Sequence, residues 1–250
     1  MSATTDVRVT AGLRERSAAF LDYLDTFVAA LPALPLADLI AGAGGAAKVA
    51  IIAVDVVNGF CKEGPLASPR VGAIVPRIAR LLEAAHTAGV RQIAVLRDSH
   101  SPAAPEFAQF GPHCLAGTAE SQLVRELAEL PFAGGFKDVP KNATSAWAGS
   151  ETLRDWVERR EAAGVTTFVT VGDCTDLCVY QTAMPLKLGA NARNREIEVV
   201  VPADCVDTYD LPVAAAQQLG AMAHDAELLH AVFLYHLSLN GIRVVRSIAA

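Results

Sequence analysis

The sequence has no run of lysines and arginines. Its 21 Lys and Arg residues are scattered and outnumbered by 27 Asp and Glu residues, which gives a net charge of -6 and a pI near 5.5. Nothing in this distribution would attract a phosphate backbone, so we exclude nucleic acid as a partner.

The first twenty residues also lack the unbroken apolar core of an export signal, because acids and arginines interrupt them. The nearly uncharged stretch 28–47 contains two prolines and three glycines that would break a membrane-spanning helix. Five cysteines are an odd number, which fits free thiols in a reducing compartment better than a disulfide framework. We therefore expect a cytoplasmic protein with no membrane contact.

No strand is followed by the glycine patterns GxGxxG or GxxxxGK, so a dinucleotide site or P-loop has no support. What the chain does contain, after residue 48, is short apolar runs that alternate with stretches of helical periodicity. Apolar runs without polar interruptions indicate strands buried on both faces. This order predicts an α/β fold, a doubly wound and mostly parallel sheet with helices on both faces. The predicted strands are 49–57, 92–97, 166–172, 196–203 and 242–248, and the predicted helices are 71–89, 119–130, 150–163, 175–190 and 212–236.

Before this pattern, apolar residues between Leu13 and Leu31 recur at the spacing of an amphipathic helix. We expect residues 1–47 to form a helical extension with a linker packed on the domain, and residues 48–250 to form the α/β domain. A chain of 250 residues, 52% of them hydrophobic, can bury one such core. The extension is predicted to cover a neighbouring subunit of a homo-oligomer or the mouth of the site.

Chemically active side chains follow three of the predicted strands. Asp55 lies near the end of the first strand, Asp98 and His100 follow the second, and Cys174 and Cys178 follow the third. Because ligands bind at the carboxyl ends of the strands in such a sheet, we expect these residues to share one edge.

The cysteine pair Cys174 and Cys178 allows two interpretations. Both could be small buried hydrophobic residues. Alternatively, a cap at Thr175 or Asp176 would place Cys178 in the first helical turn, where free amides and the helix dipole favour a thiolate. The partners it would need are available: Asp55 is costly to bury unless it is paired or acts as a base, and Lys141 could lower the pKa of a thiol.

The loop after the second strand holds two carboxylates and two imidazoles in the pattern D-x-H-x5-E-x6-H. Such ligands suit Zn²⁺, Fe²⁺ or Mn²⁺, although a polar loop without metal would look the same. The remaining histidines have no partner pattern, and we predict that they are structural. The four candidate ligands are Asp98, His100, Glu106 and His113; the structural histidines are His86, His224, His230 and His236.

Five segments, in order and with matching spacing over about residues 48–206, resemble the isochorismatase-like cysteine hydrolases, specifically their nicotinamidase/pyrazinamidase branch. They are AVDVVNGFCKEGPLA, LRDSHSPAAPEF, FGPHCLAGT, VPKNATSAW and GDCTDLCVYQTA. The resemblance implies a catalytic triad of Asp55, Lys141 and Cys178. It also implies an oxyanion hole made by the amides of Cys174 and Cys178, next to a cis peptide bond at Asp173–Cys174.

The same resemblance implies a divalent metal held by Asp98, His100, Glu106 and His113, with zinc expected first and iron or manganese as alternatives. It further implies pocket aromatics at Phe60, Phe110 and Trp147. Several positions depart from the family pattern: Val57 and Gly59 stand where nicotinamidases have Gln and Asp, and Thr144 replaces a Tyr. Leu177 stands where a polar or aromatic residue is common, and Asp173-Cys174 is unusual for the oxyanion turn.

The activity implied is deamidation of nicotinamide to nicotinate and ammonia through a cysteine thioester, on a small-molecule amide substrate. One alternative is a related hydrolase for another carboxamide, carbamoyl or ureido compound. A second is a non-catalytic binding or assembly module on the same fold, and a third is a structural metal site beside an inert cysteine.

Overall fold

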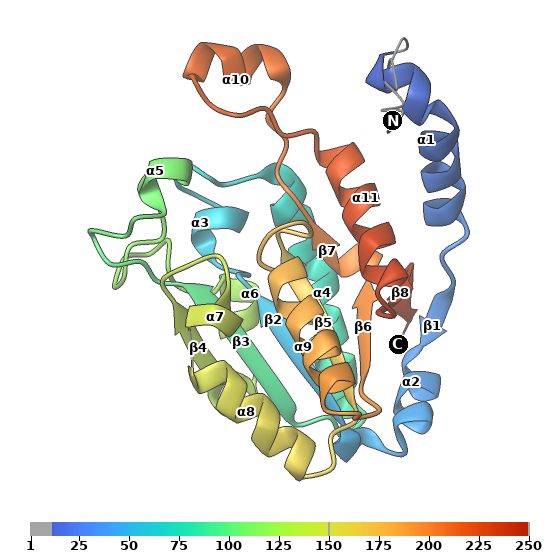
Figure 1. Cartoon of the computed structure of the whole chain (residues 1–250). Helices are drawn as coiled ribbons and strands as arrows, with labels where there is room; N and C mark the ends of the chain where they lie inside the picture. The colour runs from blue at the N-terminus through green and yellow to red at the C-terminus, as the bar shows by residue number, and fades with distance from the viewer. Residues whose placement is uncertain (1–11, 150, 250) are drawn as a thin grey trace, which may run out of the picture.

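A parallel sheet of seven strands forms the centre of the fold in a computed structural model, which describes residues 12–149 and 151–249 (Figure 1). Six strands follow the order β4-β3-β2-β5-β6-β8, and β7 pairs with the end of β5. The chain winds outward from β2 in one direction and then from β5 in the other, which confirms the predicted doubly wound sheet. The strands are β2 (Val49–Val54), β3 (Gln92–Asp98), β4 (Lys137–Lys141), β5 (Thr167–Asp173), β6 (Glu198–Pro202), β7 (Val206–Asp207) and β8 (Arg243–Val245).

Helices cover both faces of the sheet because its central strands are apolar on both sides. Every residue of β2 and of β5 is buried. Ile52 and Val54 pack in one core layer, on the face where α7, α8 and α9 lie in Figure 1, and Ile51 packs in a second layer with α4 on the opposite face. Burying one such side chain contributes roughly 1.5–3 kcal/mol. The helices are α1 (Leu13–Ala29), α2 (Leu36–Ala43), α3 (Asn58–Cys61), α4 (Pro69–Thr87), α5 (Phe107–Phe110), α6 (Arg125–Ala128), α7 (Ala146–Gly149), α8 (Glu151–Ala162), α9 (Tyr180–Ala192), α10 (Val213–Leu219) and α11 (Ala226–Leu239).

Several predicted boundaries were wrong. The predicted helix 212–236 is two helices, because Gly220 adopts a left-handed conformation that ends α10 and the Asp225 carboxylate accepts the Leu228 amide at 3.0 Å to cap α11. Of the predicted helix 119–130 only the short α6 forms. The predicted helix start at Ser150 lies outside the described residues.

The prediction of a linker over residues 28–47 was wrong. These residues contain β1 (Ala33–Pro35) and α2, because Leu34, Leu36 and Leu39 are buried in the second core layer. Strand β1 pairs in parallel with β9 (Ser247–Ala249), so the predicted final strand 242–248 is divided between two sheets.

The predicted N-terminal helix forms as α1, which lies along α11 (Figure 1). The ring of Tyr235 on α11 contacts Phe20, Tyr23 and Phe27 with centroid distances of 5.4, 5.7 and 5.6 Å. The part of the predicted extension before Gly12 lies outside the described residues, and the domain boundary near residue 47 stays a prediction. In residues 12–149 and 151–249, no helix has the length and hydropathy needed to cross a bilayer.

Candidate active site

Asp55 follows the last residue of β2 and points into the fold with no exposed surface. Its backbone has a φ of 52°, which is unfavourable for a residue other than glycine and is typical of functional positions. Two contacts hold it there: its amide donates to the Leu96 carbonyl at 2.9 Å, and its carboxylate accepts the Asp98 amide at 2.8 Å. The end of β3 therefore fixes the carboxylate at the end of β2.

Lys141 is the last residue of β4 and lies directly opposite Asp98 in the register of β3 and β4. Its ammonium group contacts three side chains in the buried site. It lies 2.8 Å from the Asp55 carboxylate and 3.6 Å from the Cys178 sulfur, and it also donates to the Asp98 carboxylate. The structure thus brings the three predicted triad residues together, with Asp98 as a fourth member.

Cys178 lies in a turn that follows β5, and the predicted helical position was wrong, because α9 begins two residues later at Tyr180. The turn is closed by the Cys174 carbonyl, which accepts the amides of Leu177 and Val179 at 3.1 Å each. Within the described part of the chain, the backbone amides of Cys174 and Cys178 donate no hydrogen bond. Both are therefore free to donate to a bound ligand. The Asp173–Cys174 peptide bond is cis.

Burial decides the electrostatics of these groups. It raises the pKa of Asp55 to about 6, although Lys141 acts in the opposite direction. It also raises the pKa of the Cys178 thiol well above its usual value, again opposed by Lys141. Burial alone would lower the pKa of Lys141, but Asp55 and Asp98 outweigh it and hold that pKa well above its usual range. The thiol therefore keeps its proton at rest and needs Asp55 as a base.

Asp98, His100 and His113 form a second group, whose ligand atoms lie within 4.8 Å of one another. Two backbone hydrogen bonds of 2.9 Å close their loop. The His100 amide donates to the Cys114 carbonyl, and the Ala116 amide donates to the His100 carbonyl. Nδ1 of His113 lies 2.8 Å from the Gly111 carbonyl, an arrangement that leaves Nε2 to face Asp98.

These three residues fit a divalent metal. His100 is completely buried. Its Nε2 lies 3.4 Å from the Asp98 carboxylate without good hydrogen-bond geometry, and in the described residues its Nδ1 has no partner. A buried imidazole satisfied this poorly is costly unless something else completes its contacts, and a metal ion would do so. Burial alone would raise the pKa of Asp98, yet Lys141 and the two imidazoles keep it below its ordinary value, so a charged ligand is ready.

Glu106 is not brought into this group. Its carboxylate instead accepts the amide of Thr144 at 2.9 Å and the hydroxyl of Thr144 at 2.6 Å. Thr144 occupies one of the positions that depart from the family pattern, and its hydroxyl holds Glu106 toward the loop after β4. As a fourth metal ligand, Glu106 would have to give up these two hydrogen bonds.

The predicted pocket aromatics divide between two places. Phe60 and Phe110 lie beside His113, at centroid distances of 5.7 and 6.4 Å, whereas Trp147 packs on the core layer that contains Cys178. Sequence reasoning missed Phe107, whose ring lies 5.4 Å from His100 and 5.6 Å from His113. Its position one residue after Glu106 was the available signal.

Gly59 has a steric reason for replacing the family's Asp. A Cβ atom at this position would lie 2.4 Å from the Cys114 sulfur, so no larger residue fits beside this cysteine. Burial raises the pKa of Cys114 above its usual range, in keeping with a packed thiol that takes no part in the chemistry.

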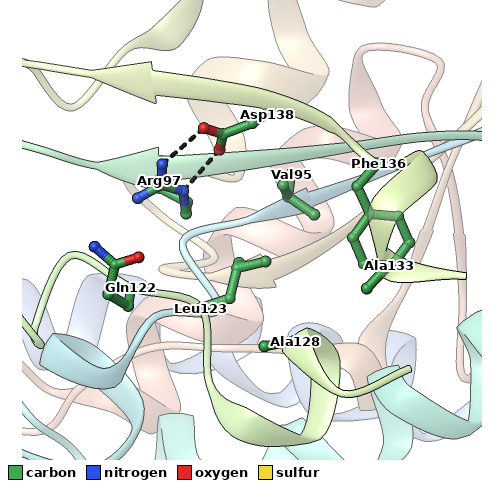
Figure 2. A pocket seen from close by; sticks show the side chains of 8 residues that line it. All are labelled: Val95, Arg97, Gln122, Leu123, Ala128, Ala133, Phe136 and Asp138. Carbon is green, nitrogen blue, oxygen red and sulfur yellow. Dashed lines mark hydrogen bonds and ion pairs between the residues drawn. The ribbon is translucent and has the colours of Figure 1, made fainter. Parts of the chain in front are cut away.

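A cavity of about 250 Å³ lies on the other face of β3 and β4 (Figure 2). Arg97 points into it and donates to both carboxylate oxygens of Asp138 at 2.7 Å. Successive residues of a strand face opposite sides, so Arg97 faces this cavity while Asp98 faces Lys141. None of the residues that line the cavity belongs to the triad or to the metal group.

The isochorismatase domain family matches residues 49–230. The chain belongs to the isochorismatase family. Nicotinamidase 1 of Arabidopsis thaliana is 33% identical over 222 residues, which cover 81% of this chain and 87% of that protein. The family resemblance predicted from the sequence is therefore confirmed, and the chain is a cysteine-dependent amidase of the nicotinamidase branch.

Solved structures of the isochorismatase family have the same fold. A nicotinamidase from Bacillus subtilis is 26% identical with a TM-score of 0.60, over 79% of this chain and 99% of that chain. The pyrazinamidase of Pyrococcus horikoshii, solved in complex with zinc, has a TM-score of 0.61 at 21% identity, over 80% of this chain and 99% of that chain.

Proposed function

We propose that this amidase converts nicotinamide to nicotinate and ammonia. The observation that carries the proposal is the buried group of Asp55, Lys141 and Cys178, which meets the metal-ligating group at Asp98. A nucleophile, a base and a cation are thus within reach of one carbonyl group, and a metal held beside them could face a ring nitrogen. The similarity to nicotinamidases supports the choice of substrate.

The proposed reaction passes through a thioester on Cys178. Asp55 accepts the thiol proton while the sulfur attacks the carboxamide carbon, and Lys141 stabilises the charges that form. The amides of Cys174 and Cys178 donate to the oxyanion. Asp55 then gives its proton to the departing ammonia, and water hydrolyses the thioester to release nicotinate.

A metal bound by Asp98, His100 and His113 would supply a Lewis acid that orients the pyridine ring. Phe60, Phe107 and Phe110 surround the imidazoles and keep the ligand set in an apolar environment. We propose zinc for this site. Iron and manganese remain alternatives because imidazole and carboxylate ligands suit all three.

The proposal is tested by ammonia release from nicotinamide, measured with chelator-treated protein, with metal-restored protein and with Cys178→Ala. We expect release that depends on metal and falls to background in the variant. Acetamide and an N-carbamoyl amino acid serve as acyclic comparison substrates. If metal-loaded protein hydrolyses either of these but not nicotinamide, the cysteine hydrolase stands and the pyridine substrate is wrong.

Metal content gives a separate prediction about the ligands. His100→Ala removes a buried imidazole ligand and is expected to reduce bound metal per chain to near zero, since loss of a ligand weakens a site strongly. Glu106→Gln is expected to retain the metal, because Glu106 bonds to Thr144. Elemental analysis of both purified variants measures this. Metal loss in Glu106→Gln would instead identify Glu106 as the fourth ligand.

Two further expectations belong to the proposal. The five cysteines are free, which supports a reducing cytoplasmic setting. A homo-oligomer, with the N-terminal extension covering a neighbouring subunit or the site, stays a prediction that light scattering would test.

A further inference from the structure

The turn that carries Cys174 and Cys178 is held by side chains from the C-terminal part of the chain. The Asp176 carboxylate lies 2.8 Å from Nε2 of His224, and the Thr175 hydroxyl lies 2.9 Å from Nδ1 of His230. Neither histidine is part of the triad or of the metal group. Both were predicted to be structural without a partner pattern, so these contacts were not expected.

His224 is fixed from three directions. Its Nδ1 lies 2.8 Å from the carbonyl oxygen of Tyr209, and its ring stacks on the Tyr209 ring with centroids 3.9 Å apart. Its backbone exchanges two hydrogen bonds with Leu211, of 2.8 and 2.9 Å. These bonds close the base of the segment 211–224, which contains α10 and extends away from the sheet in Figure 1. The imidazole that reaches Asp176 therefore has little freedom to move.

Asp176 depends on this imidazole. Its side chain is buried, and in the described part of the chain one carboxylate oxygen bonds to His224 while the other has no hydrogen-bond partner. Removing the imidazole would leave a buried carboxylate unpaired, which is strongly unfavourable. The turn would then have to rearrange so that Asp176 reaches water. Because Asp176 lies between Cys174 and Cys178, that rearrangement would separate their amides.

We propose that His224 is a positioning residue that acts through Asp176 to keep the amides of Cys174 and Cys178 directed at one oxyanion. The inference rests on the proposed thioester mechanism and adds to it a side chain outside the family triad. If His224 served folding alone, its loss would affect every reaction of Cys178. A positioning role instead predicts the loss of reactions that form an oxyanion, while the thiol itself stays reactive.

Two reactions of the same thiol separate these roles. With p-nitrophenyl acetate, the sulfur bonds to the carbonyl carbon, the thiol proton passes to Asp55, and the oxyanion collapses to expel p-nitrophenolate. With iodoacetamide, the thiol proton again passes to Asp55, the sulfur displaces iodide from a saturated carbon, and no oxyanion forms. Both rates are measured by stopped reaction and mass spectrometry at the same pH, with Cys178→Ala as the blank.

The matched variants are His224→Asn and His224→Gln. The Asn amide can replace Nδ1 but is too short to reach Asp176, whereas the Gln amide extends about as far as Nε2 and can donate to Asp176. We expect His224→Asn to lower acylation by about 10- to 100-fold, since a displaced oxyanion donor has effects of this size. Alkylation should stay within about twofold, and His224→Gln should recover most of the acylation.

His86→Asn is the control, because His86 also stacks on an aromatic ring, Phe132, with centroids 3.9 Å apart, but lies near the end of α4, away from the turn. It should change neither rate. Asp176→Ala removes the tie between the turn and His224 without leaving a buried carboxylate, so it should lower acylation by less than His224→Asn does. The double variant should be no slower than His224→Asn alone, because the unpaired carboxylate is then absent. If His224→Asn does not fold, Asp176→Ala still separates acylation from alkylation through loss of the same hydrogen bond, with a smaller fall in acylation expected.

Three results would overturn the proposal: equal acylation in His224→Asn, His224→Gln and the wild type; a parallel fall of acylation and alkylation; or no acylation of the wild type. Neither reagent contains a pyridine ring. Failure of nicotinamide turnover would therefore refute the substrate and leave this test of His224 unaffected.

Discussion

Lys141→Met is expected to lower turnover by about 10³-fold and to destabilise the protein by about 3–5 kcal/mol. The ammonium group lies between the carboxylates of Asp55 and Asp98, and all three side chains are buried. Without it, two carboxylates whose oxygens lie within 4.8 Å of each other lose their shared counter-charge. Asp55, whose pKa burial already raises to about 6, would take up a proton, and the base for Cys178 would be lost.

The measurement combines ammonia release with urea unfolding. Lys137→Met is the matched control, because Lys137 begins the same strand β4, is half-buried and contacts no carboxylate in the described ion pairs. It should change stability by no more than about 0.5 kcal/mol. Near-normal turnover in Lys141→Met would show that the cation is dispensable, and the proposed triad would then be reduced to Asp55 and Cys178.

Gly172→Ala is expected to prevent folding or to destabilise the protein by more than about 4 kcal/mol. Gly172 lies on β5 opposite Val54 of β2, and a Cβ atom there would stand 1.9 Å from the Val54 carbonyl oxygen. Its φ of +114° is also outside the range that residues with a side chain adopt readily. The backbones of β2 and β5 can approach this closely only because Gly172 has no side chain.

Soluble yield and the urea midpoint measure this effect. The control is Gly134→Ala, because a Cβ atom at Gly134 would meet nothing within 4 Å and its φ is not positive. This variant should unfold within about 0.5 kcal/mol of the wild type. A stable, active Gly172→Ala protein would mean that β5 can shift away from β2 without disturbing the ends that carry Asp55 and Asp173.

The sheet and the meeting of Asp55 and Cys178 at one edge could be predicted because they follow from coarse rules, whereas the place of Lys141 in the triad was implied only by the family resemblance. Apolar runs alternating with helices give a parallel sheet, and the ends of parallel strands share one edge. The direct contact between Lys141 and Asp98 could not be predicted in this way. It depends on the register of β3 against β4, and no pattern within either strand specifies that register.

Contacts between distant loops were beyond sequence reasoning for a similar reason. How the segments pack decides the hydrogen bonds from Thr144 to Glu106 and the contact of His224 with Asp176. It also decides the positive φ at Asp55. The thiol of Cys178 shows the same limit. A helix dipole was expected to favour its thiolate, but the helix starts later and burial acts in the opposite direction.

The pairing of β1 with β9 has a consequence for synthesis. A ribosome makes Ala33–Pro35 long before their partners Ser247–Ala249. Domains usually fold from the N-terminus while the rest is still being made. Here β1 has no partner strand until β9 has been made, so this small sheet is completed only after all strands of the large sheet have left the ribosome.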